Sequence, residues 1–248
     1  MWQFFHRLAS PKHFYELSGR LVPWLGGLCA LLLVAGLYGG LVLAPPDYQQ
    51  GESVRIIYIH VPSAWMSLFV YVVMAAAGAV GLIWRIKLAD VVAASSAPIG
   101  ASFTFLALAT GSLWGKPMWG TWWVWDARLT SELILLFLYL GVMGLYGAIE
   151  DKRTASRAAA VLALVGVVNI PIIHYSVEWW NTLHQGPTVI KFDAPSIHIS
   201  MLLPLLAMAL AFMLYYATAL LLRARCEVLE RERNAAWTQE LAKRWEVQ

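Results

Sequence analysis

The stretch Val61-Pro-Ser-Ala-Trp-Met-Ser-Leu-Phe-Val-Tyr-Val-Val-Met-Ala-Ala-Ala-Gly-Ala-Val-Gly-Leu-Ile-Trp84 decides the fold, because it is long, apolar and free of Asp, Glu, Lys and Arg. The hydrocarbon core of a bilayer is roughly 30 Å thick, and a helix needs about 20 apolar residues to cross it. This run is long enough, and Pro62 is well placed for the first turn of such a helix. The sequence therefore predicts a membrane-spanning helix here.

Five further apolar runs of similar length follow the same pattern. They are Leu21–Leu43, Val91–Leu113, Leu129–Ile149, Ala158–Val177 and Ile199–Leu222. The composition, 60% hydrophobic and 13% charged over 248 residues, is far from that of a soluble domain. We predict an all-α polytopic membrane protein with six transmembrane helices over residues 1–222, followed by a charged helical tail over residues 223–248.

Charge and cysteine content exclude two classes of protein. The net charge of +3 does not indicate nucleic-acid binding, because the basic residues occur in short clusters between apolar runs and form no single patch. The two cysteines, Cys29 and Cys226, are far apart and form no CxxC motif. We therefore expect neither nucleic acid as a partner nor thiol redox chemistry.

The distribution of Lys and Arg predicts the orientation in the membrane. Six spans place both termini on one side, which carries fourteen of the eighteen Lys and Arg residues. The other four are Arg55, Lys116, Arg128 and Lys191. By the positive-inside rule both termini are cytoplasmic. Three less regular segments then face outward, Ala44–His60, Trp114–Arg128 and Glu178–His198, and we expect the functional chemistry there.

The second outward segment is the most unusual part of the chain. It reads Trp114-Gly-Lys-Pro-Met-Trp-Gly-Thr-Trp-Trp-Val-Trp-Asp-Ala-Arg128, so that Trp114, Trp119, Trp122, Trp123 and Trp125 lie within twelve residues. An interfacial aromatic belt explains single tryptophans near span ends, but not this density. Glycine and proline break regular structure at its start, and we expect Trp122–Arg128 to form a short helix in the interface. The resulting apolar shelf suits a flat ligand such as a porphyrin, a quinone or a sterol.

Histidines at or near the outer face narrow the choice of ligand. They are His60, His174, His184 and His198. Haem iron needs axial nitrogen ligands. His60 lies near a predicted helix N-terminus, whose positive dipole end favours the neutral ring that can bind iron. His184 ends the fifth span, so these two histidines flank the shelf, although a single histidine in such a place is more often packed or interfacial than a ligand.

Few Lys and Arg residues lie on the predicted outer side, and their charged groups could serve either a ligand or the protein itself. Arg55 and Arg128 are candidates to contact the propionates of a haem. Arg128 could equally pair with Asp126, and Lys116 could simply anchor the interface with its charged end in water. Asp126 itself is suited to cap the helix that enters the fourth span, or to orient Arg128.

Three segments carry a resemblance to a known family. The stretch Trp119-Gly-Thr-Trp-Trp-Val-Trp-Asp-Ala-Arg-Leu-Thr-Ser131 resembles the tryptophan-rich WWD signature of the haem-handling proteins of cytochrome c maturation. The stretches Tyr58-Ile-His-Val-Pro-Ser-Ala-Trp65 and Val177-Glu-Trp-Trp-Asn-Thr-Leu-His-Gln-Gly186 are similar to one branch, the CcmC or haem exporter protein C family. The resemblance covers nearly the whole chain.

The resemblance implies a site and a set of partners. His60 and His184 would be the axial ligands of a non-covalent, bis-histidine haem b, and the tryptophan-rich loop would hold the porphyrin. The protein would lie in a bacterial inner membrane with this site facing the periplasm. It would present haem to the chaperone CcmE, beside the ATP-binding cassette pair CcmA and CcmB and the single-span CcmD. It would not be an enzyme and would have no ATPase of its own, because the segment Gly111–Lys116 is one residue short of a phosphate loop and Pro117 replaces the required Ser or Thr.

Two other classes stay open on the residues alone. A membrane cytochrome b also uses paired histidines, but usually holds its haem between helices, with ligands inside the spans. A permease would move its solute through the centre of the bundle, and Asn169 and Pro171 in the fifth span could mark a polar break on such a path.

Overall fold

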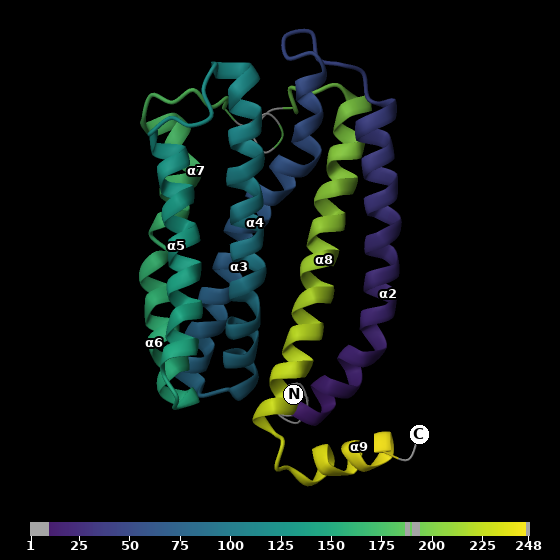
Figure 1. Ribbon diagram of the computed structural model, residues 1–248, viewed down its shortest axis with the longest axis vertical. Coiled ribbons are helices and arrows are strands. Elements are labelled where there is room, and N and C mark those ends of the chain that lie inside the picture. The colour runs from purple at the N-terminus through teal and green to yellow at the C-terminus, as the bar shows by residue number, and fades with distance from the viewer. Residues whose placement is uncertain (1–9, 187–188, 190–193, 247–248) are drawn as a thin grey trace.

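The computed structural model describes residues 10–186, 189 and 194–246, which form a bundle of helices (Figure 1). With the labels of Figure 1, the helices are α2 Pro11–Tyr38, α3 Ile57–Trp84, α4 Lys87–Trp119, α5 Ala127–Ala148, α6 Lys152–Gly166, α7 Asn169–Trp179, α8 Ile199–Arg231 and α9 Ala236–Glu246. A π-helical turn, η1 Gly39–Leu43, extends α2, and a 3-10 helix, η2 Glu52–Ile56, leads into α3. In this part of the chain there is no strand, only an isolated bridge between Asp47 and Gly51.

The prediction of an all-α protein with six spans is confirmed. Six helical segments of the described residues are long and apolar enough to cross a membrane. They are Pro11–Leu43, Glu52–Trp84, Lys87–Trp119, Ala127–Ala148, Lys152–Trp179 and Ile199–Arg231. The chain is therefore a multi-pass membrane protein.

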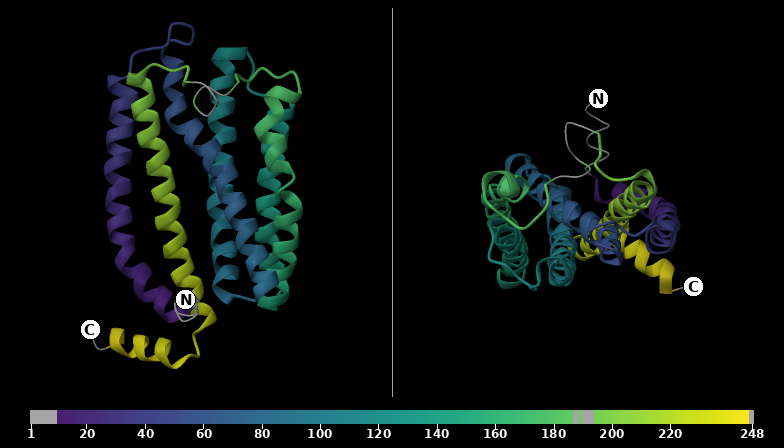
Figure 2. Two further views of the ribbon diagram at one scale, coloured as in Figure 1. Left: turned by 180° about the vertical axis from the view of Figure 1, so that it is seen from behind. Right: turned by 90° about the horizontal axis from the view of Figure 1, so that it is seen from above.

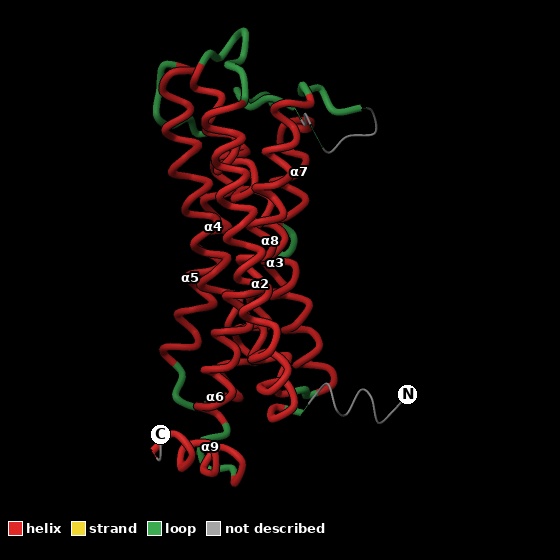
Figure 3. The backbone as a smooth tube through the Cα atoms, turned by 90° about the vertical axis from the view of Figure 1, so that its right-hand side faces the viewer, coloured by secondary structure: helices red, strands yellow, loops and turns green. Residues whose placement is uncertain are grey.

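The helices pack as two groups joined by α3. Figure 1 shows α2 beside α8 on one side of the bundle, and α4, α5, α6 and α7 on the other. α3 crosses diagonally between them, next to α8 at one end and next to α6 at the other (Figure 2). The start of α2 and the short helix α9 lie at the same end of the molecule (Figure 3). We call this the basic end and the opposite end, which holds the turn at residues 120–126, the aromatic end.

The fifth span is interrupted close to Asn169 and Pro171, the residues that could mark a polar break. α6 ends at Gly166 and α7 begins at Asn169, because proline lacks the N–H that would continue the helical hydrogen bonds. The buried Asn169 side chain donates from Nδ2 to the carbonyl oxygen of Ser131 in α5 at 2.9 Å. The break is thus tied to its neighbour by a hydrogen bond, as a polar group inside a membrane requires.

The short interfacial helix expected over Trp122–Arg128 is absent, and this expectation was wrong. α4 instead runs through Gly115 and Pro117 to Trp119 and ends where Gly120 adopts a left-handed φ of 76°. Residues 120–126 are irregular, and α5 starts at Ala127. The reason is that glycine and proline are tolerated within membrane helices, so they do not end α4 as they would end a helix in water.

The predicted boundary of the tail falls inside a helix. α8 continues past Leu222 to Arg231, where Arg231 Nε donates to Glu227 Oε1 at 2.7 Å in an i,i+4 pair. Ala224 and Val228 on this extension are buried against Val91 of α4. The tail is helical, and its first part packs on the bundle.

Candidate ligand-binding site at the aromatic end

A cavity of about 380 Å³ lies at the aromatic end, lined by residues of α3, α4, α5 and α7 and by the segment after α7. Its volume falls in the range of about 300 to 1,000 Å³ that is usual for small-molecule sites. Apolar side chains make much of the wall, including Val61, Ala64 and Leu68 from α3. Seven of the described polar or charged residues line the same space, and they include both histidines predicted as ligands, His60 and His184.

His60 reaches this cavity from the first turns of α3, with a fixed ring orientation. Its Nδ1 lies 3.0 Å from the hydroxyl oxygen of Thr110, and that hydroxyl donates its own proton to the carbonyl of Leu106 at 2.6 Å. The Thr110 oxygen must therefore accept, so Nδ1 carries a proton. In the neutral form of this ring the lone pair lies on Nε2, which is then the nitrogen that could bind a metal.

His184 enters the same cavity from the segment after α7, held by Asp126. Its Nδ1 lies 3.3 Å from Asp126 Oδ2, while the other carboxylate oxygen accepts from the backbone N–H of Leu129 at 2.8 Å. Asp126 is the N-cap of α5, as one of the two sequence interpretations predicted. Because the carboxylate accepts from Nδ1, the neutral form of the His184 ring carries its lone pair on Nε2.

The electrical environment of His184 favours its neutral form. Burial lowers the pKa of His184 below its ordinary value, against an opposing contribution from the Asp126 carboxylate. The Arg128 guanidinium adds to the lowering. The ring is therefore uncharged at neutral pH, which is the state that binds metals.

The five tryptophans divide into two groups. Trp114 and Trp119 line the cavity, and each packs edge-on against a histidine, Trp114 on His60 at 5.6 Å and Trp119 on His184 at 4.8 Å between ring centroids. The other three do not line the cavity. Trp122 is 53% exposed and Trp125 is 76% exposed, and Trp123 packs edge-on against Trp125. The shelf predicted from the sequence is thus split between a cavity wall and an outer surface.

Of the two arginines predicted to contact propionates, only one lines the cavity. Arg128 lines the cavity from the first turn of α5 and donates from Nη1 to the carbonyl of Ile173 at 3.3 Å. Arg55 does not line it. Instead, Arg55 donates to the carbonyls of Gly40 and Ala44 at 2.9 and 3.1 Å, which holds the end of η1.

Lys116 belongs to the turn and not to the cavity. Its ammonium group donates to the carbonyl of Gly120 at 3.1 Å and lies over the Trp122 ring, 6.0 Å from the centroid. It therefore stabilises the end of α4 and one exposed tryptophan. This agrees with the interpretation of Lys116 as an anchor at the interface.

Sequence reasoning did not assign several residues that line the cavity. They are Gln50, Trp65, Met118, His174 and Glu178. Gln50 accepts from the indole N–H of Trp114 at 3.0 Å, which links the first outward loop to the cavity wall. The resemblance names His60 and His184 as ligands but not His174, whose ring packs edge-on against Tyr175. The sequence could not indicate Gln50, because its place in the cavity wall depends on the tertiary contact with Trp114 and no motif surrounds it in the chain.

Two histidines are too few to hold a free metal ion, but they suit the iron of a haem, whose other ligands come from the porphyrin ring. Among the described residues, no group of three or more His, Cys, Asp and Glu side chains could hold a metal ion. Two imidazoles and an arginine in a tryptophan-walled cavity fit haem, which needs axial nitrogens for iron and cations for propionates. Fold and cavity together define a class: a polytopic helical membrane protein with an imidazole-bearing candidate ligand site at one end of the bundle.

Comparison with known proteins identifies the family. Residues 4–239 match the family described as heme exporter protein C, CcmC. The chain is 54% identical to heme exporter protein C of Escherichia coli K12 over 241 residues, which cover 97% of each chain. It is 50% identical to that of Haemophilus influenzae over 98% of each chain, and 56% identical to that of Bradyrhizobium diazoefficiens over 90% of this chain and 85% of the relative. The chain belongs to the heme exporter protein C family.

Proposed function

We propose that this protein binds haem as a cargo at the aromatic end and presents it to the chaperone CcmE during cytochrome c maturation. The observation that carries the proposal is the pairing of His60 and His184 in one cavity. Each ring has its Nδ1 engaged by a protein acceptor, so that in the neutral form Nε2 would be the nitrogen that binds iron. Family membership, with relatives named for heme export, supports the identity of the cargo.

The remaining lining residues would position a bound haem. Indole edges and aliphatic side chains offer a large apolar surface, and burial of such surface contributes about 25 cal/mol per Å². Arg128 is the cation at the cavity and would contact a propionate. Arg55 would reach a propionate only by leaving the carbonyls of Gly40 and Ala44 and its ion pair with Glu52.

The position of the cavity favours delivery over electron transfer or permeation. A cytochrome b usually holds haem between helices in the middle of the membrane, whereas this cavity opens at one end of the bundle. The positive-inside rule assigns that end to the periplasm of a bacterial inner membrane, because the Lys and Arg residues gather at the other end. The chain would act as a haem-handling protein and not as an enzyme, with any use of ATP by CcmA and CcmB and with CcmD as a further subunit.

The exposed tryptophans would serve the handover. Trp122 and Trp125 lie outside the cavity with large exposed fractions, on the segment that joins Trp119 to Asp126. Exposed aromatic side chains are typical of protein contact sites. They would contact CcmE or the edge of the haem that is presented to it.

Haem transfer to purified CcmE tests this proposal. The double variant Trp122→Ala, Trp125→Ala should bind haem like the wild type but deliver it to CcmE at a rate lower by about tenfold, the cost expected for a lost contact of roughly 1.4 kcal/mol. Trp84→Ala is the matched control, because Trp84 is an exposed tryptophan at the opposite end of the bundle. An unchanged transfer rate in the double variant, or an equal loss in the control, would contradict the assigned role.

A further inference from the structure

A second, larger cavity of about 670 Å³ lies at the basic end of the bundle. It is formed where the turn between α3 and α4, the start of α6 and the end of α8 meet. We call it the basic cavity. It is separate from the haem site, and the proposed function makes no use of it.

Basic side chains dominate its lining. Seven are cationic: Arg85, Lys87, Lys152, Arg153, Arg157, Arg231 and Arg233. Three are acidic: Asp90, Glu230 and Glu232. The lining thus carries four more positive than negative charges. The positive-inside rule accounts for cations at this end of the molecule, but not for their convergence on one cavity.

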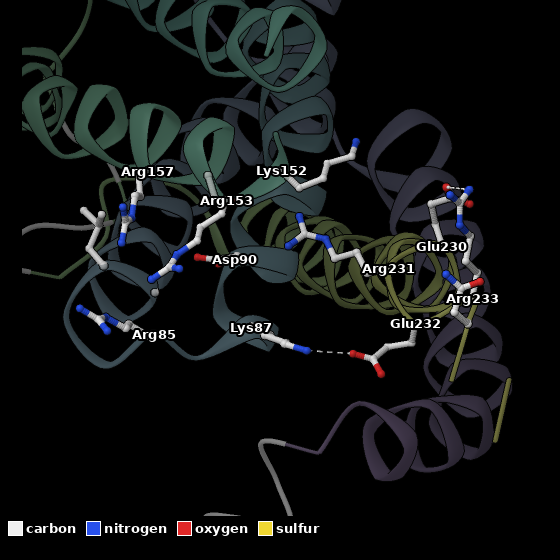
Figure 4. Close-up of a pocket in the computed structure, with 14 residues that line it drawn as sticks. Arg85, Lys87, Asp90, Lys152, Arg153, Arg157, Glu230, Arg231, Glu232 and Arg233 are labelled. Atoms are coloured by element: carbon white, nitrogen blue, oxygen red, sulfur yellow. Dashed lines mark hydrogen bonds and ion pairs between the residues drawn. The ribbon is translucent and has the colours of Figure 1, made fainter. Parts of the chain in front are cut away.

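Ion pairs neutralise only part of this charge. Lys87 pairs with Glu232 at 3.3 Å and Arg233 with Glu230 at 3.6 Å. Both pairs lie toward the end of α8 (Figure 4). They remove both glutamates of the lining as partners for the other cations.

Three guanidinium groups gather on one side of the cavity without such partners. Figure 4 shows Arg85, Arg153 and Arg157, from the end of α3 and the first turns of α6, beside Asp90. Within the described part of the chain, none of the three forms an ion pair. With both lining glutamates paired, the half-buried Asp90 is the one carboxylate of the described lining that remains.

Arg231 provides an independent indication of a missing acceptor. Its Nε donates to Glu227 at 2.7 Å, while its Nη2 is buried and has no hydrogen-bond partner among the described residues. A buried donor that is left unpaired costs roughly 1 to 3 kcal/mol, and more when it is charged. An anion in the cavity would supply the acceptor.

The surroundings of the cavity indicate a lipid as the source of that anion. The wall includes Gly81 and Leu82 near the end of the α3 span, and the adjacent Ile83 and Trp84 are exposed. Tryptophan at the end of a span marks the height of the headgroups. Basic pockets between transmembrane helices at that height suit phosphate headgroups, and guanidinium groups bind phosphate through paired hydrogen bonds. We propose that the basic cavity binds the phosphate headgroup of an anionic phospholipid.

Lipid binding to the purified protein tests this proposal. Native mass spectrometry would compare phosphatidylglycerol with phosphatidylcholine on the wild type and on the variant Arg85→Gln, Arg153→Gln, Arg157→Gln. The expected result is a preference of the wild type for phosphatidylglycerol and at least about a tenfold loss of its affinity in the variant, since each such cation contributes about 1 kcal/mol. If the triple variant loses helicity, the single variants Arg153→Gln and Arg157→Gln carry the test, with about a fivefold loss each.

The control removes the same charge from the same end of the molecule but outside the cavity. Arg20→Gln, Arg223→Gln, Arg244→Gln changes three exposed arginines that do not line it. This control should bind phosphatidylglycerol like the wild type. Equal losses in the two triple variants, or equal wild-type affinities for the two lipids, would overturn the proposal. If inorganic phosphate binds as tightly as the lipid, the lipid assignment is wrong. The assignment is also wrong if the lipid does not bind and a polyglutamate peptide binds through the same arginines.

Discussion

Asp126 links the start of a transmembrane helix to a proposed haem ligand. One carboxylate oxygen caps α5 at the backbone N–H of Leu129, and the other accepts from His184 Nδ1. A side chain that orients a metal ligand through its second ring nitrogen is worth roughly 10- to 100-fold in metal affinity. The two functions of Asp126 can be separated, because asparagine is as good an N-cap as aspartate.

Asp126→Asn should lower haem affinity by roughly 10-fold or more and leave the melting temperature nearly unchanged. Asp126→Ala should lower haem affinity in the same way and should also lower the free energy of unfolding by about 1 kcal/mol, because the helix cap is lost. Haem titration and thermal unfolding of the two variants measure these effects. Wild-type haem affinity in Asp126→Asn would show that the contact with His184 does not matter for ligation.

The lowered pKa of His184 predicts a loss of stability in acid. Burial disfavours the charged ring in the folded state, so the unfolded chain binds a proton at higher pH than the folded chain does. Above the ordinary histidine pKa of about 6.5, His184 does not change the free energy of unfolding. As the pH falls from there toward the lowered pKa of His184 in the folded state, the free energy of unfolding decreases. Thermal unfolding across this window should show a shallower decline in His184→Gln than in the wild type. Identical slopes would mean that His184 is not held neutral by the fold.

The positions of single site residues were predictable where a local sequence feature indicates them, but not where they depend on tertiary contacts. His60 beside Val61-Pro62 and His184 after the fifth span were located at the outer face from the sequence, and the family resemblance singled them out as ligands. Both line the cavity. The division of the tryptophans was not predictable. Trp114 and Trp119 lie on the last turns of α4 and face the cavity, whereas Trp122 and Trp125 follow the left-handed turn at Gly120 and face outward.

At the level of secondary-structure elements, the close approach of α3 to α4 positions His60. A methyl group at Gly111 on α4 would lie 2.9 Å from His60 Cε1, closer than packed atoms allow. Gly111→Ala should therefore displace the ring and lower haem affinity by about tenfold or more, through a misplaced ligand. Gly144→Ala in α5 is the control, because a methyl group there meets nothing within 4 Å. Haem titration measures both, and similar affinities in the two variants would contradict the assigned position of His60.

The spans were predictable, but their ends were not. Apolar length and composition identify six crossings, because the bilayer sets that length. The ends of α4 and α8 lie several residues beyond the apolar runs, at Trp119 and Arg231. These extensions depend on packing against other parts of the chain, such as Val228 in its cluster with Val91, which hydropathy does not detect.

For the whole molecule, the orientation is a prediction that two labelling sites test. Cys226 is exposed near the basic end, and Cys29 is buried. Tyr48, in the first loop at the aromatic end, is 91% exposed. In intact cells with a permeable outer membrane, an impermeant maleimide should label a Tyr48→Cys, Cys226→Ser variant and leave the wild type unlabelled. Labelling of wild-type Cys226 from that side would reverse the proposed orientation.

The two ends of the molecule could be distinguished from sequence, but their cavities could not. Charge counting separates the basic end from the aromatic end, because Lys and Arg resist translocation. The cavities depend on side chains from segments far apart in the chain. The candidate haem site joins Gln50 to Val189, and the basic cavity joins Gly81 to Asn234. Such long-range contacts follow from the diagonal course of α3, which no local pattern predicts.

The most direct test of the central claim is the electron paramagnetic resonance spectrum of the ferric haem complex in detergent. The wild type should give a low-spin signal from two axial imidazoles, and His60→Ala and His184→Ala should each turn it high-spin or abolish haem binding. His174→Ala should keep the low-spin signal, because His174 lines the same cavity and has no assigned ligand role. A low-spin signal that survives in both His60→Ala and His184→Ala, or one that is lost in His174→Ala, would contradict the ligand assignment.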